Sequence, residues 1–262
     1  MLTKDFSPVL ITTPSFEVSI ASHLQEIESA FKLRFEVFNL EMQEGLESSY
    51  ETEFDSDVYD TFCDHLVVKE KASGRVVGTY RLLRQEKAEK HIGFYSENEF
   101  DLTNIKLLSG QSLEVGRSCV GKEYRSAAVI NLLWGGIARY MEIYKINRLF
   151  GCASLHTKYL PEVSLVTSFL TRNYFAPETH RVHPLPQCAM RLPVEDQSEQ
   201  DMRSAFKLLP PLMKGYLLLG GMICGDPALD KEFGTTDFLL LVESDRITDR
   251  YKKHYTEQLP QA

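Results

Sequence analysis

The segment LEVGRSCVGKEYRS, at residues 113–126, carries groups that could do chemistry within an otherwise apolar run. A strand that serves only to pack has no need of a carboxylate, a glycine and a guanidinium, here Glu114, Gly116 and Arg117. Glycine in a strand often marks a bulge or a place where a ligand approaches the backbone closely. Glu114 in apolar surroundings would be a better base near neutral pH than a solvated carboxylate. It could instead pair with a buried arginine, such as Arg81 or Arg117.

The end of this strand predicts an anion site. The strand at 113–120 runs through a short loop into a helix at about 126–144, and the unpaired N–H groups of a helix N-terminus attract anions. The residues around this point are Gly121, Lys122, Arg125 and the expected helix cap Ser126. A ligand that follows the strand edge from Gly116 to Val120 and ends in a phosphate at the next helix would be pantetheine. Ser118 could hydrogen-bond the same ligand or be an ordinary strand hydroxyl.

Two arginines, Arg81 and Arg117, lie in predicted strands, where an arginine without a partner would be costly. The other residues expected in a network with them are Asp60, Asp64, Glu114 and Arg34. One arginine could instead hold a substrate carboxylate through two parallel hydrogen bonds. The motif DTFCDH contains Asp60, Asp64 and His65, and its acids would suit a substrate ammonium. His65 could carry a proton, although a single histidine before a strand is more often structural.

Charged residues are distributed unevenly. Ten acids and no Lys or Arg lie between Phe35 and Val68, whereas nine Lys or Arg face four acids between Lys122 and Arg191. The first stretch could attract a cation and the second an anion, or both could be ordinary solvated faces. The net charge of −8 argues against general nucleic-acid binding.

Five widely spaced cysteines without a Cys-x-x-Cys pair fit reduced thiols in a cytoplasmic protein and do not support a zinc site. Cys119 is expected to be a small buried apolar residue rather than a nucleophile that forms a thioester. No apolar run approaches the roughly 20 residues that a membrane-spanning helix needs. The N-terminal residues lack the regions of a signal peptide.

The elements that position these residues follow from periodicity and turn residues. The strands besides 113–120 are expected at 16–19, 66–69, 75–83, 148–155, 220–224 and 235–243. The helices are expected at 24–38, after a capping box of Ser22 and Gln25, and at 126–144, 164–173 and 203–216, the last broken at Pro210 and Pro211. Residues 41–62 read as an acidic loop or broken helix and 85–109 as irregular. This order predicts an α/β fold around a central mixed sheet.

Seven motifs occur in order along the chain. They are LRFEVFNLEM (33–42), DTFCDHLVV (60–68), VGTYRLL (77–83), EVGRSCV (114–120), LLWGGIARYM (132–141), LFGCASL (149–155) and GGMICGDPALDKEFGTTDFLLLVE (220–243). Together they resemble the ornithine–acyl-carrier-protein N-acyltransferases, which make lyso-ornithine lipid and belong to the acetyltransferase-like superfamily. The resemblance extends from Leu33 to Glu243.

This resemblance implies an acetyltransferase-like (acyl-CoA N-acyltransferase) fold, with a central mixed twisted sheet flanked by helices. It implies a single domain over residues 1–262, with an acidic loop region at 41–64 and a C-terminal extension of the sheet at 200–243. The implied reaction transfers a 3-hydroxyacyl group from acyl carrier protein to the α-amino group of ornithine. The lipid product implies transient contact of a cytoplasmic enzyme with the inner membrane face.

The same resemblance suggests roles for the residues named above. The catalytic candidates are Glu114, Asp64 and Arg81, and those for the amino acid are Asp60, His65, Arg117, Ser118 and Arg34. The candidates for the pantetheine and its phosphate are Gly116, Val120, Gly121, Lys122, Arg125 and Ser126. The acyl-phosphopantetheine thioester is a co-substrate, and neither a metal nor a permanently bound cofactor is expected. The cationic stretch after Lys122 could dock the acidic carrier protein.

Other functions compete with this one. A glycine or other amino-acid N-acyltransferase is the first alternative, because a glycine-lipid branch has similar motifs. Acyl-homoserine-lactone synthases resemble the chain more loosely, but they usually carry tryptophan in the first helix and loop, where this sequence has none; Trp134 lies in the central helix. An acetyl-coenzyme-A-dependent N-acetyltransferase usually has a phosphate-binding loop of the pattern Gln/Arg-x-x-Gly-x-Gly/Ala, which GKEYRSA matches poorly. A non-catalytic carrier-protein binding module is the remaining class.

Overall fold

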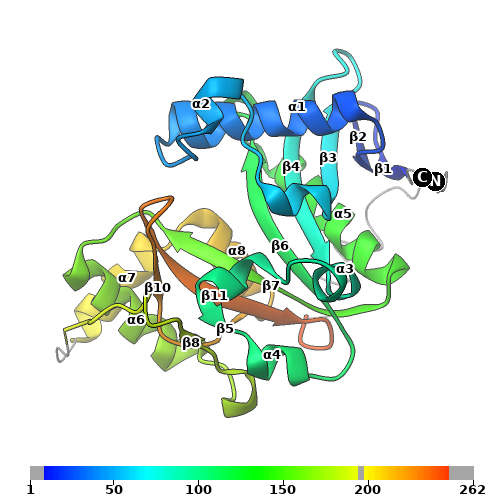
Figure 1. Ribbon diagram of the computed structural model, residues 1–262. Helices are drawn as coiled ribbons and strands as arrows, with labels where there is room; N and C mark the ends of the chain where they lie inside the picture. Colours follow the sequence, from blue (N-terminus) through cyan, green and yellow to red (C-terminus); the bar gives the residue numbers. More distant parts are fainter. Residues whose placement is uncertain (1–8, 194–197, 248–262) are drawn as a thin grey trace. The chain divides into compact units, whose positions relative to one another are not determined.

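The computed structural model describes residues 9–193 and 198–247, which fall into two compact units (Figure 1). The first unit contains residues 9–92 and 115–146, and the second contains residues 93–114, 147–193 and 198–247. The expectation of a single domain therefore stays a prediction.

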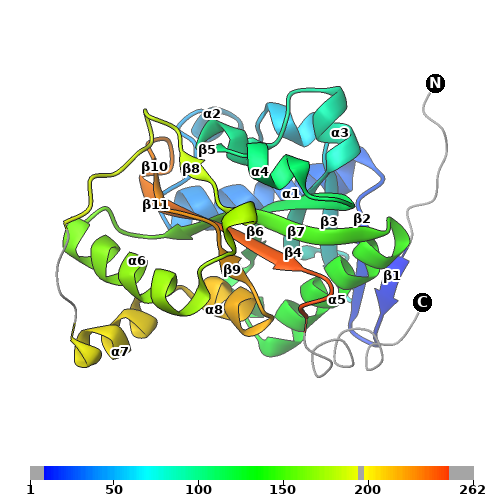
Figure 2. The same ribbon diagram turned by 90° about the horizontal axis from the view of Figure 1, so that it is seen from below.

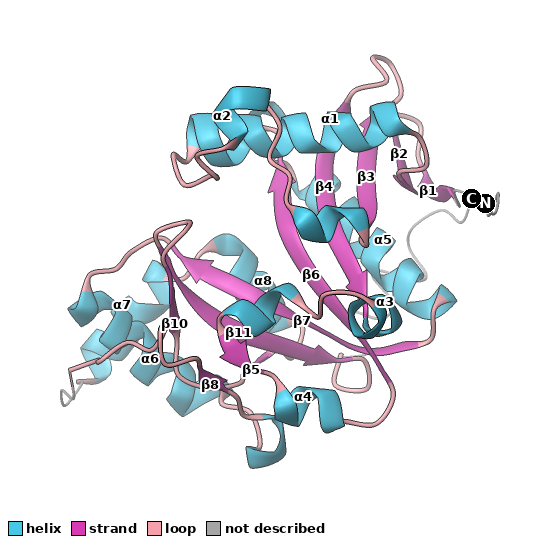
Figure 3. Ribbon diagram, viewed as in Figure 1, coloured by secondary structure: helices cyan, strands magenta, loops and turns pink. Residues whose placement is uncertain are grey.

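The sheet of the first unit is drawn in magenta in Figure 3. Its strands are β1 (Val9–Thr12), β2 (Phe16–Ile20), β3 (Asp64–Glu70), β4 (Val76–Arg84) and β6 (Gln111–Val120), whose first residues belong to the second unit. Neighbours from β1 to β4 pair antiparallel, and β6 lies beside β4. The predicted hairpin of β3 and β4 is confirmed. Its turn uses Gly74, whose φ of 70° suits glycine.

Helices cover both faces of this sheet (Figures 1 and 2). The helical elements of the first unit are α1 (Leu24–Phe35), the π-helix η1 (Glu36–Glu41), α2 (Ser49–Thr52), η2 (Val58–Thr61), α3 (Gln85–Lys90), η4 (Lys122–Tyr124) and α5 (Ala127–Ile143). Leu33 of α1 packs in one cluster with Val67 of β3. A Cβ added at Gly136 of α5 would lie 3.0 Å from Leu66. Because consecutive strand residues point to opposite faces, α1 and α5 lie on opposite sides of the sheet.

One predicted helix cap is wrong, although both helices begin close to the expected positions. The N-cap of α1 is His23, whose side chain makes no capping hydrogen bond, and the backbone N–H of Ser22 donates to the Glu26 carboxylate (3.0 Å). Ser126 is the N-cap residue of α5, as predicted, although its side chain makes no capping hydrogen bond. A periodic pattern locates a helix, whereas a cap depends on one side-chain rotamer.

The second unit is built on the antiparallel pair β7 (Ile146–Leu155) and β11 (Thr235–Glu243). Residues of this pair that lie directly opposite one another include Ser154 with Asp237 and Cys152 with Leu239. Two short strands, β9 (Met222–Ile223) and β10 (Ala228–Asp230), also pair with β11. A separate two-stranded sheet consists of β5 (Phe100–Asp101) and β8 (His183–Pro184).

The helical elements of the second unit are η3 (Tyr95–Asn98), α4 (Thr103–Leu107), α6 (Leu160–Tyr174), η5 (Glu178–His180), α7 (Glu199–Leu208) and α8 (Pro211–Leu218). The predicted break at Pro210 and Pro211 is confirmed, since α7 ends before it and α8 begins at Pro211. Figure 2 shows α6 beside α7.

Residues 85–109, which were expected to be irregular, contain α3, η3, β5 and α4. These elements have only two to six residues, too few for a periodic pattern to appear in the sequence. The predicted α/β class is confirmed, with helices against a sheet. Within residues 9–193 and 198–247, no helix has both the length and the apolar character needed to cross a membrane.

Candidate active site

Arg34 is the centre of a buried ion network in the first unit. Its Nε donates to Asp55 at 2.6 Å, and its two terminal nitrogens donate to the two carboxylate oxygens of Asp60 at 2.7 and 3.0 Å. Arg34 is 1 % exposed and Asp55 is 0 % exposed. A guanidinium this deeply buried needs such partners, because burial without them would be strongly unfavourable.

The arginines of the two strands join the same network. Nη1 of Arg81 donates to both oxygens of Asp57 at 2.7 Å and lies 3.5 Å from Asp60. Arg117 donates to Asp57 at 3.1 Å, and its Nε lies 3.4 Å from Asp55. The expected arginine–aspartate network is confirmed for Arg81 with Asp60. Asp55 and Asp57 were not among its expected members.

Asp60 and His65 have surroundings that fit structural roles. Burial alone would raise the pKa of Asp60, but the charges of Arg34 and Arg81 hold it well below its usual value. The Asp60 carboxylate also accepts the backbone N–H of Asp57 at 2.8 Å, which caps η2. Nε2 of His65 lies 3.3 Å from the Asp60 carbonyl oxygen, and burial lowers the pKa of this histidine. The ring is therefore neutral at pH 7.

Asp64 lies apart from these ion pairs, half-buried at the start of β3. Its carboxylate accepts a hydrogen bond from the Tyr140 hydroxyl, and Nε of Arg84 lies 3.6 Å away. Burial, together with the charge of Asp64, raises the pKa of Tyr140 above its usual value. Tyr140 thus stays a hydrogen-bond donor across the physiological pH range.

The strand β6 has open space beside Gly116 and an irregular backbone at Arg117. No atom lies within 4 Å of the place where a Cβ on Gly116 would stand, so space is open beside this residue. Arg117 has a φ of +46°, a left-handed conformation that costs a non-glycine residue roughly 1 kcal/mol. A residue in this conformation inside a strand is typical of a bulge. Of the neighbours along β6, Ser118 is half-buried, and Cys119 is buried as predicted.

Burial raises the pKa of the Cys119 thiol far above its usual value. A thiol that stays protonated is a poor nucleophile. The expectation that Cys119 packs rather than reacts is therefore supported.

The loop after β6 presents positive charge near the start of α5. Lys122 is exposed, as are the first residues of α5. Arg125 donates to the carbonyl oxygen of Val120 at 3.1 Å and forms a two-point ion pair with Glu41 at 2.5 and 2.7 Å. The backbone N–H of Gly121 donates to Val77 of β4. A cavity of about 440 Å³ lies beside this loop, between α1, η1 and η4.

Glu114 lies in the part of β6 that belongs to the second unit and is 5 % exposed. One carboxylate oxygen accepts the backbone N–H of Tyr95 at 2.7 Å. The other accepts the backbone N–H of Ser96 at 2.8 Å and its hydroxyl at 2.6 Å. Three donors from η3 therefore hold this carboxylate in one orientation. Ser96 is fully buried, and no sequence pattern singled it out.

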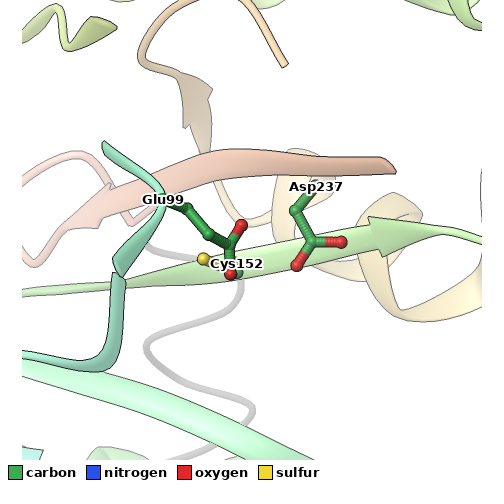
Figure 4. A group of neighbouring side chains, drawn as sticks. All are labelled: Glu99, Cys152 and Asp237. Atoms are coloured by element: carbon green, nitrogen blue, oxygen red, sulfur yellow. The ribbon is translucent and has the colours of Figure 1, made fainter. Parts of the chain in front are cut away.

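A second acidic cluster, which contains Glu99 and Asp237 with Cys152 beside them, lies in the same unit (Figure 4). Ligand atoms of Glu99, Cys152 and Asp237 all lie within 4.8 Å of one another. The Cys152 thiol donates to the Ser96 hydroxyl at 3.4 Å, and the Thr235 hydroxyl donates to Asp237 at 2.8 Å. Glu99 and Asp237 are 4 % and 3 % exposed. Two carboxyl groups of different segments are thus brought together in the interior.

The pKa of Glu99 is raised to about 9. Burial is the largest cause, and the charges of Asp237, Asp230 and Glu114 add to it, while a hydrogen bond with Cys152 acts in the opposite direction. Glu99 is therefore protonated at neutral pH in the absence of a nearby cation.

Replacing Glu99 with glutamine should change how stability depends on pH. A carboxyl group whose folded pKa is raised from 4.5 to about 9 destabilises the fold progressively as the pH rises between these values, because the unfolded chain binds fewer protons there. The melting temperature of Glu99→Gln should therefore exceed that of the unaltered protein by a margin that grows from pH 5 to pH 9. Thermal unfolding of both proteins at pH 5 and pH 9 measures this difference in melting temperature. An equal difference at the two pH values would contradict the raised pKa of Glu99.

The sites found here differ in part from those expected. The first unit brings together Arg34, Asp60, His65, Arg81 and Arg117. Glu114 instead accepts hydrogen bonds from residues of η3. Asp55 and Asp57 were visible only as members of the acidic stretch. Glu99 and Asp237 stand 138 positions apart in the numbering, and no local spacing could have linked them.

Comparison with known proteins gives consistent similarities. A family profile described as "Acetyltransferase (GNAT) domain" matches residues 33–135. A curated L-ornithine N(alpha)-acyltransferase of Brucella abortus (strain 2308) is 40% identical over 249 residues, which cover 92% of this chain and 89% of that protein. One of Rhodobacter capsulatus is 33% identical over 251 residues, which cover 94% of this chain and 96% of that protein.

Solved structures agree on the fold. The acyl-homoserine-lactone synthase LasI matches with a TM-score of 0.52 at 14% identity, covering 94% of this chain and 98% of that one. FeeM, an N-acyl amino acid synthase from uncultured soil microbes, matches with a TM-score of 0.50 at 11% identity, covering 89% and 93%. The predicted acetyltransferase-like fold is confirmed.

Proposed function

The chain belongs to the L-ornithine Nα-acyltransferase family, and from this premise we propose that it transfers an acyl group from a carrier-protein thioester to the α-amino group of L-ornithine. The observation that carries this function is the identity of 33–40% that extends over nearly the whole length of four relatives. The resemblance of the sequence motifs implies an acyl thioester as the donor.

The reaction requires a proton acceptor. The ornithine α-ammonium group must lose a proton before its lone pair attacks the thioester carbonyl. A C–N bond then forms and the C–S bond breaks, while the nitrogen loses a second proton to give the amide and the leaving thiolate takes up one proton to give the thiol. We assign the acceptor role to Glu114, acting directly or through a water. Its position supports this role, because the three donors from η3 hold the carboxylate in one orientation. Asp64 and Tyr140 are a second candidate pair for proton transfer.

For the donor, we assign the pantetheine arm to the edge of β6 and its phosphate to the loop at 121–126. The open space beside Gly116 supports an approach of the arm to the backbone. Exposed Lys122 and the exposed start of α5 support binding of an anion, since a long helix carries partial positive charge at its N-terminus. Arg125 would have to exchange its partner Glu41 for the phosphate. The acidic carrier protein would dock on the cations that follow Lys122.

The buried ion network is assigned to positioning rather than to substrate contact. The carboxylate of Asp60 is occupied by Arg34, and Arg81 and Arg117 are both bound to Asp57. These contacts fix β4, β6 and η2 of the first unit against α1. We therefore expect Arg34, Arg81, Arg117 and His65 to support the site without touching ornithine.

An assay with purified protein tests the function. Incubation with 3-hydroxyacyl–acyl carrier protein and ornithine should release free thiol and give N-acyl-ornithine by mass spectrometry. Glycine, S-adenosylmethionine and an amine-free sample serve as comparisons, and acyl-coenzyme A replaces the carrier protein in a parallel series. Turnover with glycine but not with ornithine would contradict the substrate. Equal efficiency with coenzyme A would contradict the assigned donor.

A further inference from the structure

We propose that Glu99 and Asp237 bind the side-chain ammonium of ornithine, an inference that rests on the function proposed above. Glu99 directly follows η3, and Asp237 lies on β11. Their carboxyl groups lie near one another in the interior of the second unit (Figure 4).

The geometry of the cluster fits a small cation. The ligand atoms of Glu99, Cys152 and Asp237 lie within 4.8 Å of one another, so one nitrogen could contact more than one of them. An ammonium group has three hydrogen atoms to donate and needs three acceptors. Two carboxylates and a neighbouring oxygen or sulfur atom would supply them.

Glu99 carries an independent indication that something is bound here. It is 4 % exposed, and its Oε2 has no hydrogen-bond partner among the described residues. A buried carboxyl oxygen without a partner loses its hydration and gains nothing in return. The raised pKa of this group has the same origin, since a buried carboxyl beside other acids ionises readily only when a cation joins it.

The face of β7 next to the cluster is partly open. Cys152 and Ser154 are half-buried, whereas Gly151 and Ala153, which point to the other face, are buried. Ser154 lies directly opposite Asp237 in the antiparallel pair, so it shares the face of the cluster. A side chain of three methylene groups could therefore reach the acids along this face.

The cluster is also linked to the candidate base. The Ser96 hydroxyl donates to Glu114 at 2.6 Å and accepts from the Cys152 thiol at 3.4 Å. Hydrogen bonds through Ser96 and Cys152 thus connect Glu114, which is assigned to the α-amino group, with the cluster that is assigned to the side-chain nitrogen. An amino acid with nitrogen at both ends matches this arrangement, and one without a side-chain nitrogen does not.

A metal ion fits the same residues less well. Structural zinc sites take four ligands, and the described part of the chain brings three together. A cysteine that binds zinc does so as the thiolate. Burial raises the pKa of Cys152 well above its usual value, so the thiol stays protonated.

The test compares ornithine with norvaline, which has the same carbon chain without the terminal nitrogen. The unaltered enzyme should acylate ornithine with a kcat/KM at least about 10-fold higher than norvaline, since a buried charge-assisted contact is lost with the nitrogen. Glu99→Gln and Asp237→Asn should each raise KM for ornithine by about 10–100-fold and leave kcat/KM for norvaline within about 3-fold. Asp226→Asn, which removes one exposed acid of the same unit, should change neither.

Three results would overturn the inference. The first is an enzyme that acylates norvaline as efficiently as ornithine. The second is a loss of activity in Glu99→Gln and Asp237→Asn that is equal for both substrates. The third is a chelator that abolishes activity, with bound metal present in the unaltered protein and absent from both variants. Absence of N-acyl transfer to any amino acid would instead contradict the proposed function, so the two failures can be told apart.

Discussion

Replacing Glu114 with glutamine should lower the turnover of ornithine acylation by about 10²–10⁴-fold, the usual contribution of a positioned general base. Glutamine has nearly the same shape but does not take up a proton near neutral pH. The affinity for acyl carrier protein should stay roughly unchanged, because Glu114 is 5 % exposed and offers almost no surface for docking. Steady-state kinetics and a carrier-protein binding titration measure the two quantities.

The pH–rate profile separates this role from a structural one. If Glu114 accepts the proton, the acidic limb of kcat against pH should disappear in Glu114→Gln and persist, with a shifted midpoint, in Glu114→Asp. Glu232→Gln removes an exposed carboxylate of the same unit by the same chemical change and should leave the profile unaltered. Full activity of Glu114→Gln would remove this residue as the base.

Asp60→Asn should lower the free energy of unfolding by about 3–5 kcal/mol, because Arg34 would keep its buried charge and lose its two-point partner. For a chain of this size that corresponds to a fall of roughly 6–20 °C in the melting temperature. Neutralising one acid leaves three arginines against two aspartates in the network. Thermal or urea unfolding of the purified variant measures the effect.

Glu41→Gln is the matched control for stability. Glu41 also forms a two-point pair with an arginine, Arg125, but both side chains are about a third or more exposed. Solvent screening limits such a pair to less than about 1 kcal/mol. If Asp60→Asn and Glu41→Gln lowered the free energy of unfolding by similar amounts, burial would not be the reason why the network stabilises the protein. Retained ornithine selectivity in Asp60→Asn would support its positioning role.

The elements with long periodic patterns were predictable from the sequence. The helix α5 and the strands β3, β4, β7 and β11 lie within a few residues of their expected ranges, because elements of 7 to 17 residues are long enough to show their apolar pattern in the sequence. The short elements β1, β10 and η3 could not be predicted, since three or four residues contain no period. The capping box of Ser22 and Gln25 failed because the N-cap of α1 is His23, whereas Ser126 stands at the N-cap of α5 without making a capping hydrogen bond.

The candidate site was predictable only where its residues share a motif. Glu114, Gly116 and Arg117 stand together on β6 and could be named at once. Their partners could not: Glu114 is held by Ser96, whose segment was expected to be irregular. Arg117 is held by Asp57, one of ten acids in a stretch where nothing distinguished it. Residues that come into contact only through the tertiary fold have no characteristic spacing in the sequence, so one sequence does not reveal them.

The left-handed backbone at Arg117 limits which substitutions can accumulate during evolution. Its conformation favours glycine by roughly 1 kcal/mol, while its ion pairs with Asp55 and Asp57 favour arginine. Loss of one of these aspartates would remove an ion pair that favours arginine at position 117, while the unfavourable left-handed conformation of the arginine would remain. We therefore expect positions 55, 57 and 117 to change together, with glycine becoming acceptable at position 117 only where both aspartates are lost.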